Sequence, residues 1–398
     1  MSDTLTAPTT VAEVIERITA IQPLLRQNAA EGEIARRVPE ASIQALRAAG
    51  AFRIGTPARY GGLEGTTQDQ LDVAAAVGYA DGGAGWTVAL ANVCGWLAAL
   101  FSRQAQDELF GDNPDALVTG VLAPTATAVR VDGGYQITGK WYYNSGSWEA
   151  DWAGVGIPIP NEAGEIVNQG VVLIPRRDYS IDETWFVAGM RSSASNCIVV
   201  EDVFVPDHRV MLVPPAIGGQ YANEFTADEP VHRSAFVPVL ALVLIGAQLG
   251  LGRAAYDFVV EKAATKPIAY SFFERQAEST AVQLQVAKAA QLLDTAELHA
   301  RRAASDIDTA AAAGDYPDYL MRARVRADTA LIAESVTQAI DILLWVHGAG
   351  SFAESSPLQR IWRDSAVAAR HGVIAPAVSY EVYGKAILGD ERPVSPLV

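Results

Sequence analysis

The chain has 398 residues, of which 50% are hydrophobic and 19% charged, so it can bury a large core and is expected to form two or three domains. Its net charge of −16, with 30 scattered Lys and Arg, argues against nucleic acid and anionic membranes as partners. No secretory leader or run of about 18 uninterrupted apolar residues is visible, so we expect a cytoplasmic protein without a membrane span. The separate Cys94 and Cys197 predict neither a disulfide framework nor a metal site.

The N-terminal part of the chain is expected to be helical. Between residues 10 and 48, apolar side chains recur at helical spacing, at Val11, Val14, Ile15, Ile18 and Ile21. A second helical stretch is predicted from residue 68 to about residue 109, broken by Gly82, Gly83 and Gly85. We assign residues 1–116 to an N-terminal helical domain.

The composition changes at about residue 117, where β-branched and aromatic residues become frequent. The segment from Val129 to Ile137 has two alternating runs around an Asp-Gly-Gly turn, which predicts a β-hairpin. Further strands are predicted at residues 171–174 and 198–205. We assign residues 117–230 to a small central β domain.

The last third of the chain returns to long helices. Residues Val282, Val286, Ala289, Leu293, Ala296 and Ala300 step by three and four along one helical face, as do Ile332, Val336, Ile340 and Leu343. Shorter helices are expected from about Pro357 onward. We therefore assign residues 231–398 to a C-terminal four-helix bundle, which gives an α+β fold.

Several motifs occur in the order found in one known family. These are Pro57–Leu63 (PARYGGL), Tyr135–Gly146 (YQITGKWYYNSG), Gly189-Met190-Arg191 with Val203–Pro206, and Arg360–Asp364. Together with the three-part layout they resemble the acyl-CoA dehydrogenase superfamily over nearly the whole chain. The resemblance implies an N-terminal helical domain, a central β domain and a C-terminal helical bundle around a flavin, in a homotetramer that also fits the apolar long helices.

One position separates the two branches of that superfamily. In the common dehydrogenases, a Glu that removes the substrate proton follows an Arg-Asp pair. Counted from Arg363-Asp364, its position falls on Gly372, which cannot remove a proton. The neighbouring His371 instead resembles the histidine of the oxygenase branch. That branch includes the oxygenase components of p-hydroxyphenylacetate hydroxylase, dibenzothiophene monooxygenase and the sugar nitrososynthases.

The resemblance to this branch implies the oxygenase component of a two-component flavin-dependent monooxygenase. Such an enzyme uses reduced FAD or FMN and O2, through a flavin C4a-hydroperoxide, and here we expect hydroxylation of an aromatic or heteroaromatic, indole-like small molecule. No Gly-x-Gly-x-x-Gly follows a strand, so the reduced flavin is expected from a separate flavin reductase. The alternatives are an acyl-CoA dehydrogenase, an oxygenase that attacks N or S of an amino sugar or thioether, and a non-catalytic scaffold.

Two residues are candidates for catalysis. Ser145 matches the serine whose hydroxyl holds the hydroperoxide in the oxygenase family, although a serine there can also simply close a turn. His371 is expected to stabilise the hydroperoxide and to move a proton during oxygen transfer, because imidazole titrates near neutral pH. A lone histidine can also be structural.

The remaining candidates are expected to bind the cofactor or the substrate. Trp141, Tyr143 and Asn144 lie on the strand and turn that carry the flavin ring in the family, and Gly348, Gly350 and Ser351 resemble a small-residue turn near the flavin or its phosphate. Core packing, or a helix end for the glycines, would explain them equally. Asn92, Cys94, Trp96 and Phe236 are expected around the substrate. Phenol hydroxylases of the family often have a histidine where this chain has Cys94, which favours a substrate that is not a phenol.

Overall fold

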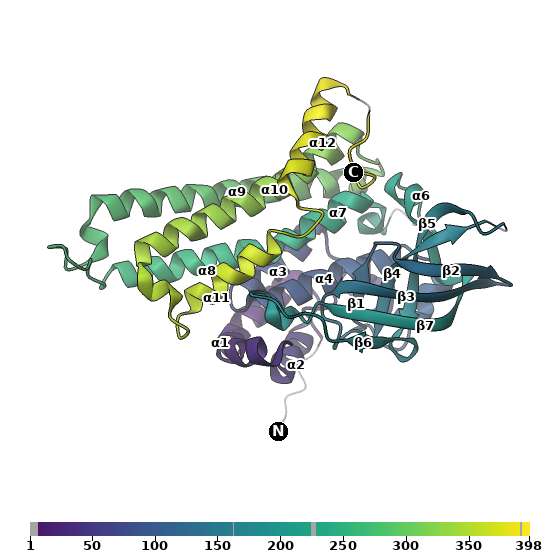
Figure 1. Ribbon diagram of the computed structural model, residues 1–398, viewed down its shortest axis with the longest axis horizontal. Helices are drawn as coiled ribbons and strands as arrows, with labels where there is room; N and C mark the ends of the chain where they lie inside the picture. The colour runs from purple at the N-terminus through teal and green to yellow at the C-terminus, as the bar shows by residue number, and fades with distance from the viewer. Residues whose placement is uncertain (1–6, 162, 224–227, 391) are drawn as a thin grey trace.

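The computed structural model describes residues 7–161, 163–223, 228–390 and 392–398. The β domain lies on one side of a central group of helices and the long C-terminal helices extend from the other side (Figure 1). This arrangement confirms the predicted α+β architecture of N-terminal helices, central sheets and C-terminal helices.

The N-terminal region forms five α-helices. Thr10 caps the first, and Asp81 caps the fourth by accepting hydrogen bonds from the backbone N–H groups of Gly83 and Ala84. The glycines expected to break the second helical stretch lie instead in the first turn of the fourth helix, where a Cβ on Gly85 would come 2.6 Å from the Cα of Gly78. These helices are α1 (Val11–Ala35), α2 (Glu40–Ala49), α3 (Thr67–Gly78), α4 (Gly82–Ala99) and α5 (Arg103–Phe110).

The central region contains two four-stranded sheets that pack face to face around one apolar core. Their orders are β1-β4-β5-β8 and β2-β3-β7-β6, and only the β1–β4 pair is parallel. The predicted hairpin is confirmed, because Val131 pairs with Gly134 across a turn in which Gly133 has a φ of 73°. The strands are β1 (Val118–Val121), β2 (Ala126–Val131), β3 (Gly134–Asn144), β4 (Trp152–Pro160), β5 (Ile166–Pro175), β6 (Ser180–Asp182), β7 (Asn196–Pro206) and β8 (Val210–Leu212).

The C-terminal region is helical. The two predicted long helices are present and pack along each other, and the next helix begins at Pro357 as expected. Two stretches, 236–263 and 319–347, are long and apolar enough to cross a membrane, but both lie mainly inside the protein. The helices are α6 (Val213–Ile217), α7 (Phe236–Leu242), α8 (Gly246–Ala263), α9 (Thr280–Ala313), α10 (Tyr319–His347), α11 (Pro357–Ala368) and α12 (Pro376–Leu388).

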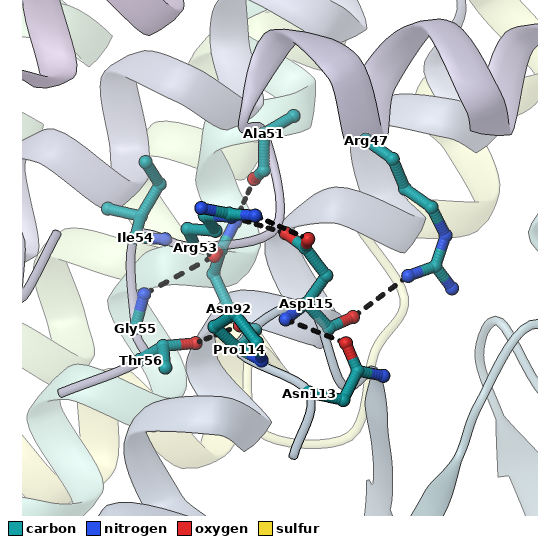
Figure 2. Close-up of polar contacts among 10 residues, drawn as sticks. All are labelled: Arg47, Ala51, Arg53, Ile54, Gly55, Thr56, Asn92, Asn113, Pro114 and Asp115. Carbon is teal, nitrogen blue, oxygen red and sulfur yellow. Dashed lines mark hydrogen bonds and ion pairs between the residues drawn. The ribbon is translucent and has the colours of Figure 1, made fainter. Parts of the chain in front are cut away.

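Helix α4 is buried along its whole length, and Asn92 fixes it to the loop that precedes α3. The Asn92 amide oxygen accepts from the backbone N–H groups of Ile54 and Gly55, and its Nδ2 donates to the carbonyl of Ala51 (Figure 2). The same Nδ2 also donates to the carbonyl of Val88, one turn earlier in α4. Both ends of the Asn92 amide are thus bonded within the protein, and its expected place at the substrate stays a prediction.

The same loop is held from its other side by charged groups. Arg53 forms a two-pronged ion pair with Asp115, with 2.6 Å between Nη2 and Oδ2, and Arg47 donates to the Asp115 carbonyl (Figure 2). A bidentate pair fixes both position and orientation. The loop therefore joins the start of the β domain to α4.

Replacing Asn92 by Ala is expected to lower stability and to leave substrate affinity unchanged in the protein that remains folded. The change leaves two buried N–H groups and a carbonyl without their partner, which costs roughly 3 kcal/mol. The thermal unfolding midpoint measures this, and Gln44→Ala, which removes an exposed amide bonded only to Glu40, is the matched control. An Asn92→Ala protein of normal stability with a raised KM would instead show that Asn92 binds the substrate.

Candidate active site

Ser145 lies in a tight turn directly after β3. Tyr143 and Gly146 both have positive φ values, of 73° and 68°, and the N–H of Gly146 donates to the carbonyl of Ser193 over 2.7 Å. Thr119 on β1 donates its hydroxyl to the Ser145 carbonyl at 2.9 Å. The backbone on both sides of Ser145 is thus fixed, and its buried hydroxyl has a defined direction.

The Ser145 hydroxyl contacts a residue that the sequence analysis did not single out. Trp86, in the first turns of α4, donates its indole N–H to the Ser145 Oγ over 2.9 Å. An indole N–H can only donate, so Ser145 must accept this bond. The local sequence contains one signal for this role of Trp86. Four small residues follow Asp81, and Trp86 is the large aromatic residue that comes directly after them.

His371 joins the same group from the C-terminal region. Its ring centroid lies 5.8 Å from that of Trp86, with the planes tilted by 55°. His371 follows the end of α11, in the turn before α12, and not on a helix as expected. Ser145, Trp86 and His371 therefore bring the β domain, the N-terminal helices and the C-terminal helices together at one place.

The environment of His371 keeps its ring neutral. His371 is exposed at the surface of the single chain, but the protein packed around its ring desolvates the imidazole and lowers its pKa from 6.5 to about 4. The backbone N–H of Val373 points to Nδ1 at 3.4 Å. If Nδ1 accepts, the neutral ring carries its proton on Nε2, which has no partner among the described residues.

Contacts of Arg363 and Asp364 hold α11 against the β domain and against α1, and so place His371. Asp364 accepts the N–H of Met190 over 2.6 Å, and Arg363 pairs with Glu33 and donates to the Ala188 carbonyl. Burial raises the pKa of Asp364 to about 7. A Cβ on Gly189 would lie 2.1 Å from the Arg363 carbonyl oxygen, which shows how closely the two segments approach.

Trp141 and Tyr143, the two aromatic residues expected at the flavin, have different surroundings because β3 has a bulge after Trp141. The register of β3 against β7 shifts between Trp141 and Asn144, and the positive φ of Tyr143 lies within that shift. Trp141 is buried in the β core and donates to the carbonyl of Gly156, which is the core-packing alternative, and its place against the flavin stays a prediction. Tyr143 is exposed, edge-on to Trp185, and the Nδ2 of Asn144 closes the bulge on the Trp141 carbonyl.

The small-residue turn lies far from Ser145 within this chain. Gly348, Gly350 and Ser351 follow the end of α10, at the end of the long helices that points away from the β domain (Figure 1). The Ser351 hydroxyl donates to the Leu344 carbonyl at 3.3 Å and so completes the helix end. One copy of the chain does not bring this turn to the Ser145 group.

The residues expected around the substrate are apolar and buried. Trp96 donates its indole N–H to the Val231 carbonyl over 2.7 Å and its ring lies 6.5 Å from that of Phe236, so both fill the junction between α4 and α7. Both side chains are almost fully buried, and their expected contact with the substrate stays a prediction. Cys94 packs against Gly120, whose Cβ would lie 2.9 Å from the Cys94 Sγ, and burial raises the pKa of the thiol to about 12.

The Ser145 group suits a flavin ring by the chemistry of its donors. A flavin edge offers ring nitrogens and carbonyls that need hydrogen bonds in a setting poor in water. Ser145 and the Nε2 of His371 supply such groups beside the flat ring of Trp86. Within the described residues, no cluster of His, Cys, Asp or Glu could hold a metal ion.

Known proteins match this chain over most of its length. The family description "Acyl-CoA dehydrogenase, N-terminal domain" matches residues 12–110, and "Acyl-CoA dehydrogenase, C-terminal domain" matches residues 242–376. The flavin-dependent monooxygenase oxygenase subunit HsaA of Rhodococcus jostii is 32% identical, with 94% of this chain and 98% of that protein covered. The oxygenase component of the FADH(2)-dependent resorcinol hydroxylase of Rhizobium sp. is 33% identical, with 90% of each covered.

A solved structure is also similar. XiaF from Streptomyces sp., in complex with FADH2 and glycerol, has a TM-score of 0.91 and 37% identity, with 98% of each chain covered. The chain belongs to the acyl-CoA dehydrogenase-like oxygenase components of the flavin-dependent monooxygenases.

Proposed function

We propose that this oxygenase component hydroxylates an electron-rich heteroaromatic small molecule, such as an indole, with reduced FAD and O2. The observation that supports it most is the group of Ser145, Trp86 and neutral His371, drawn from three parts of the chain. A dehydrogenase needs a base at this place, and Gly372 has no side chain to provide one. Two relatives are named for FADH2, which supports FAD over FMN as the flavin. A separate reductase supplies the reduced FAD.

When bound, reduced flavin supplies the electrons that activate O2 for insertion of one oxygen atom into the substrate. The chain's own residues hold and protect this chemistry. Neutral His371 can donate a hydrogen bond from its Nε2–H to an oxygen atom and so hold that atom in place without a change of charge. Trp86 covers one side of Ser145 and His371 and helps to exclude water.

The apolar surroundings of Cys94 favour a substrate without a phenolic group. A thiol with a pKa of about 12 stays protonated and cannot draw the proton from a phenol as an imidazole could. An indole ring is electron-rich without losing a proton. The name of the Rhizobium relative points to a phenol, so resorcinol is the natural competing substrate in a test.

The first prediction concerns the ionisation of His371. Because its folded pKa lies below the unfolded value of 6.5, the ring is neutral above about pH 4 to 5, and protonation of the unfolded chain removes stability as the pH falls from 6.5 towards 4. NMR of labelled histidine, assigned with His371→Gln, should show an Nε2–H tautomer with a midpoint near 4. A midpoint between 6 and 7 would contradict this role.

The second prediction concerns coupling of oxygen use to product formation. Ser145→Ala and His371→Ala should each lower product per O2 by roughly tenfold and release hydrogen peroxide, because each removes a hydrogen-bonding group from the flavin site and such a bond contributes about 1–3 kcal/mol. Peroxide and product are measured with reduced FAD, a flavin reductase, and indole or resorcinol. His299→Ala, a histidine paired with Asp328 between α9 and α10, is the control. Normal coupling in both variants would overturn the assignment.

The third prediction concerns assembly. Since Gly348–Ser351 and Ser145 lie at different ends of one chain, one flavin can reach both only if a second copy supplies the turn. The exposed Tyr270, Phe272 and Trp345 near the same end of the bundle are apolar surface for that contact. Sedimentation should show a homotetramer. A stable monomer at micromolar concentration that still binds flavin would disprove it.

A further inference from the structure

The Ser145 hydroxyl is one end of a chain of three buried serine hydroxyls. Its Oγ lies 2.8 Å from that of Ser195, and the Ser195 Oγ lies 2.8 Å from that of Ser193. Ser193 ends the short 3-10 helix η3 (Arg191–Ser193), and Ser195 directly precedes β7. All three residues are buried, and only Ser145 has a part in the proposed function.

The hydrogen bonds that link the three serine hydroxyls can run in either direction. A serine hydroxyl donates one hydrogen bond and accepts up to two, and Trp86 already fills one acceptor position of Ser145. If Ser195 donates to Ser145, the proton of Ser145 is free to point at a ligand. If Ser145 donates to Ser195, its remaining lone pair is free to accept from a ligand.

A flavin presents both kinds of partner. The central ring nitrogen that gains a proton on reduction accepts a hydrogen bond in oxidised flavin and donates one in reduced flavin. We propose that Ser195 is a positioning residue that lets Ser145 meet both forms, and that it strengthens binding of the reduced form in particular. The inference rests on the proposed function, because it needs Ser145 to face the flavin.

The preference for reduced flavin follows from what removal of Ser195 would leave behind. With oxidised flavin, Ser145 would still accept from Trp86 and donate to the ligand, and only a lone pair would lose its partner. With reduced flavin, Ser145 would accept twice and its own O–H would be buried without an acceptor. An unpaired buried donor is the more costly of the two outcomes.

The test is anaerobic titration of the flavin-free protein with reduced FAD and, separately, titration with oxidised FAD. Ser195→Ala should weaken binding of reduced FAD by about tenfold and change that of oxidised FAD by less than about threefold. Ser147→Ala is the matched control. Its hydroxyl donates to the Ala194 carbonyl and accepts from Asn196 outside the chain of three, so both affinities should stay unchanged.

A double variant separates positioning from general damage to the fold. In a Ser145→Ala background, Ser195→Ala should no longer change the affinity for reduced FAD, because Ser195 acts only through Ser145. Equal weakening for both redox forms, or the same effect in both backgrounds, overturns the inference. If the wild-type protein binds no reduced FAD, the proposed function itself fails.

Discussion

The hydrogen bond from Trp86 to Ser145 is the contact on which the site depends. It joins the first turns of α4 to the turn after β3, so it fixes the N-terminal helices against the β domain at the place where His371 arrives from the C-terminal helices. Because the indole can only donate, the bond also sets what the serine hydroxyl can do next. A shift of any one domain would move one member of this group away from the other two.

The surrounding structure supports this contact with rigid backbone and close approaches between segments. Asp81 caps the helix that carries Trp86, and Asp364 ties η3 to α11 through the N–H of Met190. Between them, a Cβ on Gly82 would lie 2.9 Å from a carboxylate oxygen of Asp364. Burial raises the pKa of both carboxyl groups, so each depends on these contacts for compensation.

The sequence predicted the elements well and the site only in part. Helical spacing and the Asp-Gly turn are local patterns, so the long helices and the hairpin followed from them. Ser145 and His371 came from motif resemblance. The partner of Ser145 was missed because residues 86 and 145 meet only through the tertiary fold. The different surroundings of Trp141 and Tyr143 were not foreseen either, since period-two alternation does not reveal a bulge.

Helix α4 carries Trp86, Asn92 and Cys94, and no residue along it is exposed. Its close glycine contact with α3 and the three hydrogen bonds from Asn92 to Ala51, Ile54 and Gly55 oppose sliding or rotation of the helix. Exchange of a single side chain on this stationary helix therefore changes the space beside it without moving its backbone. Cys94, packed against Gly120, is a position where such an exchange would leave the Ser145 hydroxyl and the His371 imidazole in place.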